Sequence, residues 1–487
     1  MNLTYTPVHI EHAPRTRSGD RFLVGLALAL LGYALFGRGF AYWGIPPIYV
    51  GEIVLGLGII QLIRAGTLGK LASVPTMWLL GGLIALAVVR MVPYIGTYGM
   101  SAPRDAMQII YGLYALIVAA LLVERPERIR DFIRRYQLFI KVMLACIWII
   151  YLIYKVANSS IPSLPWVDGN VLVFQPKGGD IMVHMAGITV FLMVGLMRRY
   201  PLVVAGLVLN AGIIVVSNRG GMVAYFAALA VGFLLRPPEA RIGRLAYAFA
   251  FFLVLGLIVG PVFQIQDGRR QISVEQFWTN IQSVLGRSES DSLEGTKEWR
   301  LDWWETIYDY TVRGEYFWTG KGFGVNLATD DGFAVDPQLR SPHNGHMTIL
   351  ARMGVPGALL WILLQLTWFA MVLRAWWRAR EAKASRWMAV FAVLVAYWIA
   401  MHLNAAFDVY FEGPMGGIWF WTVFGVGIGA VYIYRYSPHV LSNNDDQTPT
   451  LEPLGHATDV PAADAPAIPP SRRVAWGWPA RARSAGP

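Results

Sequence analysis

Long apolar stretches dominate the sequence and limit what the chain can fold into. A helix needs about 20 mostly apolar residues to cross the hydrocarbon core of a bilayer, and many stretches reach or approach that length. They span residues 22–36, 47–63, 75–92, 104–123, 136–156, 180–197, 200–217, 220–235, 245–263, 345–373, 387–403 and 414–434. The sequence therefore predicts an all-α integral membrane protein with about 12 transmembrane helices.

The charge composition agrees with a membrane protein. Only 15% of the residues are charged and 55% are hydrophobic, whereas a soluble domain has roughly 25% charged residues. These values exclude a disordered chain and argue against an ordinary cytosolic enzyme. The net charge is +10, and in a membrane protein such an excess indicates topology rather than nucleic-acid binding. The single cysteine, Cys146, excludes an intramolecular disulfide and a cysteine-rich metal site.

The distribution of Lys and Arg predicts which ends of the helices face the cytoplasm. With a cytoplasmic N-terminus, the short inside segments hold 20 basic residues and the short outside segments hold 6. This bias favours cytoplasmic N- and C-termini and an even number of spans. The first stretch is short, and a cleaved signal peptide is the alternative to a retained span. The expected parts are a cytoplasmic N-terminal segment 1–21, spans one to nine in 22–263, an outer loop 264–344, spans ten to twelve in 345–435, and a disordered, proline-rich cytoplasmic tail 436–487.

The large outer loop, between spans nine and ten, carries a helical pattern from Glu298 onward. Leu301, Trp304, Ile307 and Tyr308 fall on one predicted face of this helix. One interpretation is a helix lying in the membrane interface, with its tryptophans at headgroup depth. The other is a small helix packed within the loop. Both interpretations let Arg300 point back towards the membrane.

His343 lies where the outer loop meets the tenth span, after Pro342. A neutral imidazole at this position could accept a proton from a sugar hydroxyl. The alternative is a capping or interfacial histidine. His346 follows three residues later, so a metal site is conceivable, but the local sequence offers no obvious third ligand. We therefore predict that there is no metal site.

Three further charged residues are predicted at the outer ends of the spans. Arg219 precedes Gly220 and Gly221 between two apolar stretches, and its fork of donors suits a pyrophosphate. The alternative is an arginine that merely reaches the membrane surface. Near the last outer turn, Asp408 and Glu412 lie on the same side as His343. They could shape an acceptor site, but we expect them to be solvated loop charges.

Together these segments resemble the O-antigen ligase and polymerase superfamily. The matching features are His343-Asn344 followed by nine residues and Gly354-Val355-Pro356-Gly357, the stretch from Arg300 to Gly324 with Trp303 and the turn Thr319-Gly320-Lys321-Gly322-Phe323-Gly324, Ser217-Asn218-Arg219-Gly220-Gly221, and the stretch 404–421. The resemblance covers about residues 180–435.

The resemblance implies a GT-C-like glycosyltransferase in the bacterial inner membrane, with the outer loop and the active site in the periplasm. The donor would be an undecaprenyl-pyrophosphate-linked glycan, and the acceptor would be lipid A–core or a growing glycan. His343 would be the catalytic base. Arg219, Arg300 and, more weakly, Arg340 would bind the donor pyrophosphate. The transfer would invert the sugar and need neither a cofactor nor a metal.

Several alternatives stay open at this point. The resemblance does not separate a ligase from a polymerase of O-antigen or exopolysaccharide repeat units. A multi-span transporter or lipid-linked glycan flippase would share the spans, but transporters usually carry charges near the bilayer midplane. A non-enzymatic scaffold of an envelope complex is the remaining possibility.

Overall fold

The computed structural model describes residues 17–167, 171–215, 219–241, 243, 265–267, 270–272, 291–334 and 339–442. The elements before the outer loop are α1 (Arg17–Phe36), α2 (Arg38–Ala41), β1 (Gly44–Ile45), β2 (Ile48–Tyr49), α3 (Val50–Ala65), α4 (Leu68–Leu71), α5 (Pro75–Tyr98), α6 (Ser101–Ile110), α7 (Gly112–Glu124), α8 (Arg128–Val156), η1 (Asn158–Ser160), α9 (Gly178–Met193), α10 (Pro201–Val215) and α11 (Arg219–Leu235). Those that follow are β3 (Ile265–Asp267), β4 (Arg270–Ile272), α14 (Asp291–Val312), α15 (Leu327–Asp330), α16 (Gly345–Glu381), α17 (Ser385–Phe407), α18 (Pro414–Tyr436) and η3 (Pro438–Leu441).

The helices have the length and surface of membrane spans. Among the described residues, seven helices are long and apolar enough to cross a bilayer: Ser18–Phe36, Pro75–Tyr98, Ser101–Glu124, Arg128–Val156, Gly345–Glu381, Ser385–Phe407 and Pro414–Tyr436. Large apolar side chains such as Trp78, Leu202 and Leu234 are mostly exposed on helix surfaces. Exposed apolar surface of this kind is unfavourable in water and natural in lipid. The prediction of a helical membrane protein is confirmed.

Eleven of the twelve predicted spans fall on helices of the structure, and the predicted span 245–263 lies outside the described residues. Three of these helices are shorter apolar segments, Gly178–Met193, Pro201–Gly212 and Gly220–Leu235. The predicted span 47–63 coincides with the 16-residue helix α3. The total of twelve spans therefore stays a prediction.

Close packing between the helices depends on small residues and on tryptophans that donate hydrogen bonds. Gly425 of α18 packs on α7 so closely that a Cβ atom there would lie 2.5 Å from the carbonyl oxygen of Ala115. Such small residues let helix backbones approach within a membrane. The buried indoles of Trp368 and Trp421 donate to the carbonyl oxygens of Phe424 and Gln108, each at 2.9 Å. Their polar atoms are thereby satisfied inside the bundle.

Basic residues tie helix termini together at one end of the bundle, which we call the Asp20 end. Asp20 of α1 pairs with Arg125 and Arg128, both at 2.8 Å. Arg130 of α8 donates to the carbonyl oxygen of Val440 in η3 at 2.6 Å. Cations next to helix C-termini are favoured by the helix dipole. Residues that the charge bias assigned to one side of the membrane thus lie together, while the cytoplasmic location of this end stays a prediction.

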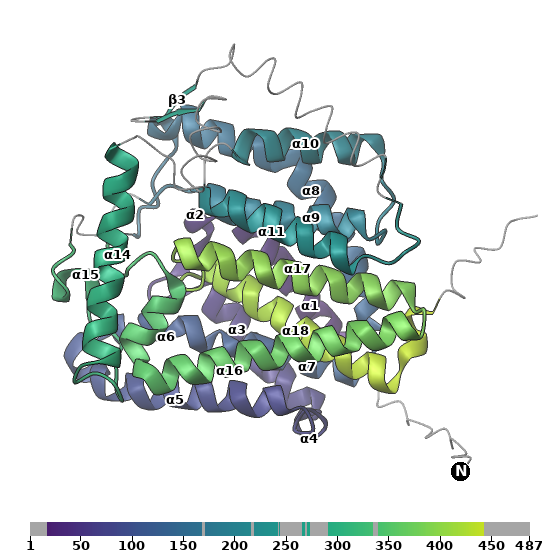
Figure 1. The fold of residues 1–487 in the computed structure, drawn as a ribbon, viewed down its shortest axis with the longest axis horizontal. Coiled ribbons are helices and arrows are strands. Elements are labelled where there is room, and N and C mark those ends of the chain that lie inside the picture. The colour runs from purple at the N-terminus through teal and green to yellow at the C-terminus, as the bar shows by residue number, and fades with distance from the viewer. Residues whose placement is uncertain are drawn as a thin grey trace, which may run out of the picture. The chain divides into compact units, whose positions relative to one another are not determined.

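The opposite end of the bundle carries the outer-loop elements. Helix α18 has 23 residues, a length of about 35 Å, and it leads from this end, which we call the Asp408 end, to η3. Helix α14 runs across the long helices rather than along them and packs against α16 (Figure 1). Its buried side chains, Trp303 and Ile307, form a small apolar core with Leu327, Ala328 and Ala351.

The helix therefore packs within the loop, and the predicted apolar face is right only in part. Trp303 and Ile307 are buried, whereas Leu301 and Tyr308 are exposed. The buried stripe follows Trp299, Trp303 and Ile307 at four-residue spacing. The prediction was wrong in part because a helix rich in aromatic residues has two faces that could be buried. The contact with α16 determines which face is buried.

Candidate functional site

His343 is held at the start of α16 by local backbone structure. Asn344 is the N-cap of α16, and its side chain accepts hydrogen bonds from the backbone N–H groups of His346 at 3.0 Å and Met347 at 3.2 Å. His343 itself has a φ of 51°, a left-handed conformation that histidine adopts more readily than most residues. The side chain of His343 is 34% exposed. The chain thus presents this imidazole just outside the helix rather than burying it.

Asp408, which follows α17, faces the His343 imidazole. The Nδ1 atom of His343 lies 3.6 Å from Oδ1 of Asp408, and the aspartate side chain is only 11% exposed. Burial tends to raise the pKa of Asp408, but Lys177 and His343 outweigh it and hold the pKa well below its ordinary value. A carboxylate that faces Nδ1 favours the proton on that atom and leaves Nε2 free to accept another.

The prediction that Asp408 and Glu412 are solvated loop charges is wrong. Glu412 accepts a hydrogen bond from the Thr348 hydroxyl at 2.7 Å. Burial raises the pKa of Glu412, and hydrogen bonds from Ser341 and Thr348 oppose that rise. The turn between α17 and α18 folds inward against the start of α16, so both carboxyl groups belong to the interior of the Asp408 end.

Arg300 reaches the same place from α14. Its Nη1 atom donates to the carbonyl oxygen of Phe407 at 3.3 Å, beside Asp408. Trp303, one turn further along α14, is completely buried and fixes the helix. The Arg300 guanidinium therefore lies at the end of α17.

Arg219 is the first residue of α11 and begins that helix next to α17. A Cβ atom on the following residue, Gly220, would lie 2.8 Å from Cβ of Phe407. The backbone of Arg219 is therefore close to the residue that Arg300 contacts. The side chain of Arg219 lies outside the described part of the structure.

Arg340 lies three residues before His343 but is held by a different group. Its Nη2 atom is 2.9 Å from Oδ2 of Asp105 in α6, and the same oxygen is 3.0 Å from Nη2 of the buried Arg352. The backbone N–H of Gly324 also donates to this oxygen at 3.1 Å. The structure thus brings His343 and Arg300 together with the start of α11, and it ties Arg340 to α6.

Both ring nitrogens of His346 lie within hydrogen-bonding distance of groups in the helix bundle. Its Nδ1 atom accepts from the Trp361 indole at 3.2 Å, and its Nε2 atom is 3.2 Å from the carbonyl oxygen of His402. The two imidazoles of His346 and His402 stack with their centroids 5.3 Å apart. Both nitrogens of His346 therefore have partners within the bundle.

The glycine-rich turn 319–324 locks onto a kink in α16. Gly354 has a φ of 67°, which interrupts the helix and which a residue with a side chain adopts only with strain. The backbone N–H of Val355 donates to the carbonyl oxygen of Phe317 at 2.8 Å, and that of Lys321 donates to Ala351 at 2.8 Å. The turn is thus a packing element that holds the kink of α16.

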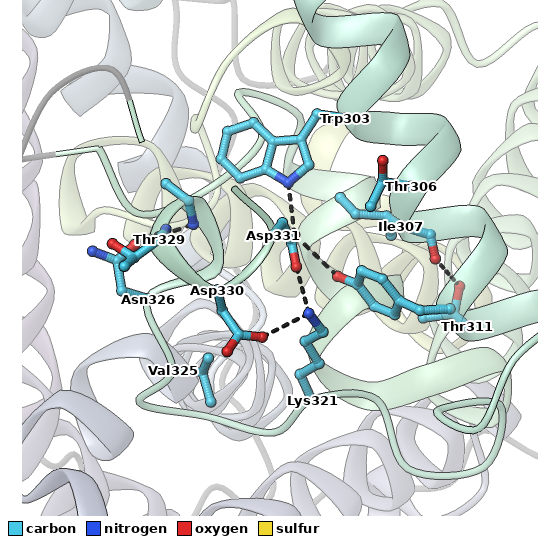
Figure 2. A network of polar contacts seen from close by, with 12 residues as sticks. Trp303, Thr306, Ile307, Thr311, Lys321, Val325, Asn326, Thr329, Asp330 and Asp331 are labelled. Carbon is cyan, nitrogen blue, oxygen red and sulfur yellow. Dashed lines mark hydrogen bonds and ion pairs between the residues drawn. The ribbon is translucent and has the colours of Figure 1, made fainter. Parts of the chain in front are cut away.

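A network of polar contacts joins this turn to α14 and α15 (Figure 2). The Lys321 ammonium lies 2.6 Å from Asp330 and 2.5 Å from Asp331. On its other oxygen, the buried Asp331 accepts from the Trp303 indole at 2.7 Å. Burial works to lower the pKa of Lys321, but the two aspartates raise it above the ordinary value. The network fixes Trp303, and with it the helix that carries Arg300.

Replacing Lys321 by methionine should lower the free energy of unfolding by about 3 kcal/mol. The reason is that the fully buried carboxylate of Asp331 loses its cation. Thermal unfolding in detergent, followed by tryptophan fluorescence, measures the change. Arg313→Met is the matched control, since the exposed pair of Arg313 with Asp309 should contribute less than about 1 kcal/mol. Equal melting of the two variants would contradict the structural role of the network.

The comparison with known families identifies the segment that carries these residues. Residues 202–362 match the family model described as O-antigen ligase. This segment is similar to the O-antigen ligase family. The match covers roughly a third of the chain and confirms the resemblance to the O-antigen ligase and polymerase superfamily. A comparison with curated proteins gave no match.

The matched segment includes Arg219, Arg300, Arg340 and His343. Asp408 lies outside it and reaches the site only through the fold, as does Lys177, whose Nζ atom is 2.5 Å from Oδ1 of Asp408. In the sequence, Lys177 is one of the six basic residues of the short outer segments. A signal was present, because Lys177 directly precedes Gly178-Gly179 just as Arg219 precedes Gly220-Gly221.

Proposed function

We propose that the protein transfers a glycan from an undecaprenyl-pyrophosphate carrier to a sugar hydroxyl on the periplasmic face of the bacterial inner membrane. The match of its central segment to the O-antigen ligase family model supports glycosyltransferase-like chemistry on lipid-linked glycans. The observation that carries the proposal is the meeting of a base and a cation at the Asp408 end. His343 faces Asp408 at 3.6 Å, and Arg300 donates to the adjacent residue, Phe407.

The helix ends at this site favour an anionic donor. Helices α9, α11, α16 and α18 all begin next to the residues just described. A helix N-terminus carries a partial positive charge and unpaired N–H groups, so it attracts phosphate oxygens. Arg219 and Arg300 would hold the pyrophosphate and stabilise the charge that grows on it as it leaves. Arg340, held by Asp105, would add positive charge nearby.

In the proposed step, Nε2 of His343 takes the proton from the acceptor hydroxyl while Asp408 holds Nδ1–H. The acceptor oxygen forms a bond to the anomeric carbon, and the bond from that carbon to the phosphate oxygen breaks. The electron pair of that bond leaves with the undecaprenyl pyrophosphate. Attack from the face opposite the leaving group inverts the anomeric centre, and the step as written needs no metal or cofactor.

Glycan profiling tests this function. A deletion strain would be complemented with wild type or His343→Ala, and lipopolysaccharide and secreted polysaccharide would be compared. Loss of glycan from lipid A–core, with polymer retained on the carrier, supports the ligase that we propose. Single repeat units in place of long chains would instead indicate a polymerase of the same superfamily. Full restoration by His343→Ala would refute the catalytic proposal.

A further inference from the structure

Lys177 lies at the site but takes no part in the transfer step described above. Its Nζ atom is 2.5 Å from Oδ1 of Asp408, the same carboxylate oxygen that lies 3.6 Å from Nδ1 of His343. A single oxygen thus faces an ammonium group on one side and the imidazole on the other. The Lys177 side chain is 40% exposed, so it could leave this position unless the backbone held it there.

The backbone does hold Lys177 at the site. Lys177 is the N-cap of α9 with an extended conformation, φ −110° and ψ 125°. Two residues earlier, the N–H of Gln175 donates to the carbonyl oxygen of Phe36 at 2.8 Å, and Gln175 accepts from the N–H of Arg38 at 3.2 Å. The segment before α9 is therefore fastened to the end of α1, and the lysine is directed to Asp408 by its own helix start.

We propose that Lys177 is a positioning residue that takes up part of the Asp408 charge and so keeps the His343 imidazole neutral at the pH of the reaction. This inference rests on the proposed function, in which neutral His343 accepts the proton. A carboxylate that serves His343 alone would stabilise the imidazolium more strongly. With Lys177 on the same oxygen, the carboxylate still orients Nδ1–H but attracts a second proton to the ring less.

The charge states of the two partners agree with this role. Burial works to lower the pKa of Lys177, but Asp408 and Asp180 raise it above the ordinary value. The pKa of Asp408 is held low, as described above, so ammonium and carboxylate are both charged at neutral pH. Among the described side chains, the other charged or titratable groups around this pair are Asp180 of α9, Arg300 of α14, and Tyr410 and Glu412 of the turn before α18.

The test measures the protonation of His343 directly. Diethyl pyrocarbonate reacts with the neutral imidazole, so the rate of modification against pH gives the midpoint at which His343 gains its proton. Mass spectrometry of the purified full-length protein in detergent would quantify this rate for His343. The exposed His439 in η3 serves as the internal reference in each sample. Neither donor nor acceptor is needed, so the readout is independent of transfer activity.

Two substitutions should move the midpoint in opposite directions. Lys177→Met should raise it by on the order of one pH unit, because Asp408 then acts on His343 alone. Asp408→Asn should lower it, because the anion is gone. Lys177→Arg, which keeps the charge, and Lys155→Met, a lysine at the end of α8, are the matched controls and should leave it unchanged. Lys177→Gln provides the same comparison if the methionine variant does not fold.

The results separate this inference from the proposed function. An unchanged midpoint in folded Lys177→Met or Lys177→Gln would overturn the role of Lys177, and so would a loss of transfer at every pH without a shift. The second result would indicate a direct phosphate contact or a purely structural tie. Full transfer by His343→Ala would refute the proposed function instead, even if the midpoint moved as expected.

Discussion

Replacing His343 by alanine is expected to lower the rate of glycan transfer by about 10²–10⁴-fold, the contribution typical of a positioned general base. The acceptor hydroxyl would then lose its proton to water rather than to an imidazole held against Asp408. The side chain of His343 is one-third exposed, so its removal should leave the fold intact. Initial rates with purified protein, lipid-linked glycan donor and acceptor, together with a melting temperature, measure both effects.

His439→Ala is the matched control for this experiment, because it removes an exposed histidine in η3, beyond the far end of α18. It should transfer at the wild-type rate. A His343→Ala protein that melts normally and also transfers at the wild-type rate would show that His343 is not the base.

Arg300→Ala should lower the transfer rate by about 10²–10³-fold, comparable to the removal of one preorganised donor to a developing negative charge. Arg300 is directed to the Phe407 carbonyl at 3.3 Å by a helix whose neighbouring Trp303 is buried. Its position is therefore set before the donor binds, and no reorganisation is required. Arg300→Lys should recover only part of the rate, because an ammonium cannot form the paired hydrogen bonds of a guanidinium.

Arg313→Ala provides the control, because Arg313 directly follows α14. Its side chain is 68% exposed and pairs with Asp309 of α14 at 3.0 Å. Transfer by this variant should match wild type. Equal rates for Arg300→Ala and Arg313→Ala would show that Arg300 does not stabilise the leaving pyrophosphate. That role would then fall to Arg219 and Arg340.

The spans were predictable because lipid imposes a simple condition on the sequence. Every long apolar stretch that lies within the described residues became a helix, since a backbone in hydrocarbon has few other ways to satisfy its hydrogen bonds. The positions at which helices break or kink could not be predicted from the sequence. The separation of α6 from α7 at Tyr111 and the kink at Gly354 depend on packing against other elements.

The site residues were predictable where one segment holds both the residue and its context. His343 stands out beside Pro342 and Asn344, and Arg219 stands out beside two glycines. Asp408 was predicted to be a solvated loop charge. Its burial could not be predicted, because it depends on contacts with Lys177 and His343, which are 231 and 65 residues away in the sequence. The pairing of Arg340 with Asp105 of α6 was not predicted either. Partners so distant in sequence are determined only by the tertiary structure.

The kink in α16 gives the spacing of the histidine and glycine residues a geometric meaning. Residues 345–353 form the part of α16 before the kink, a rise of about 14 Å. The kink is fixed from outside by Phe317 and Lys321, so the number of residues before it determines both the height and the direction of His343. One inserted residue would turn the imidazole by about 100° around the helix axis and away from Asp408. The position of the proposed base is thus determined by its distance along the chain from a fixed kink inside the bundle, and not by the membrane surface.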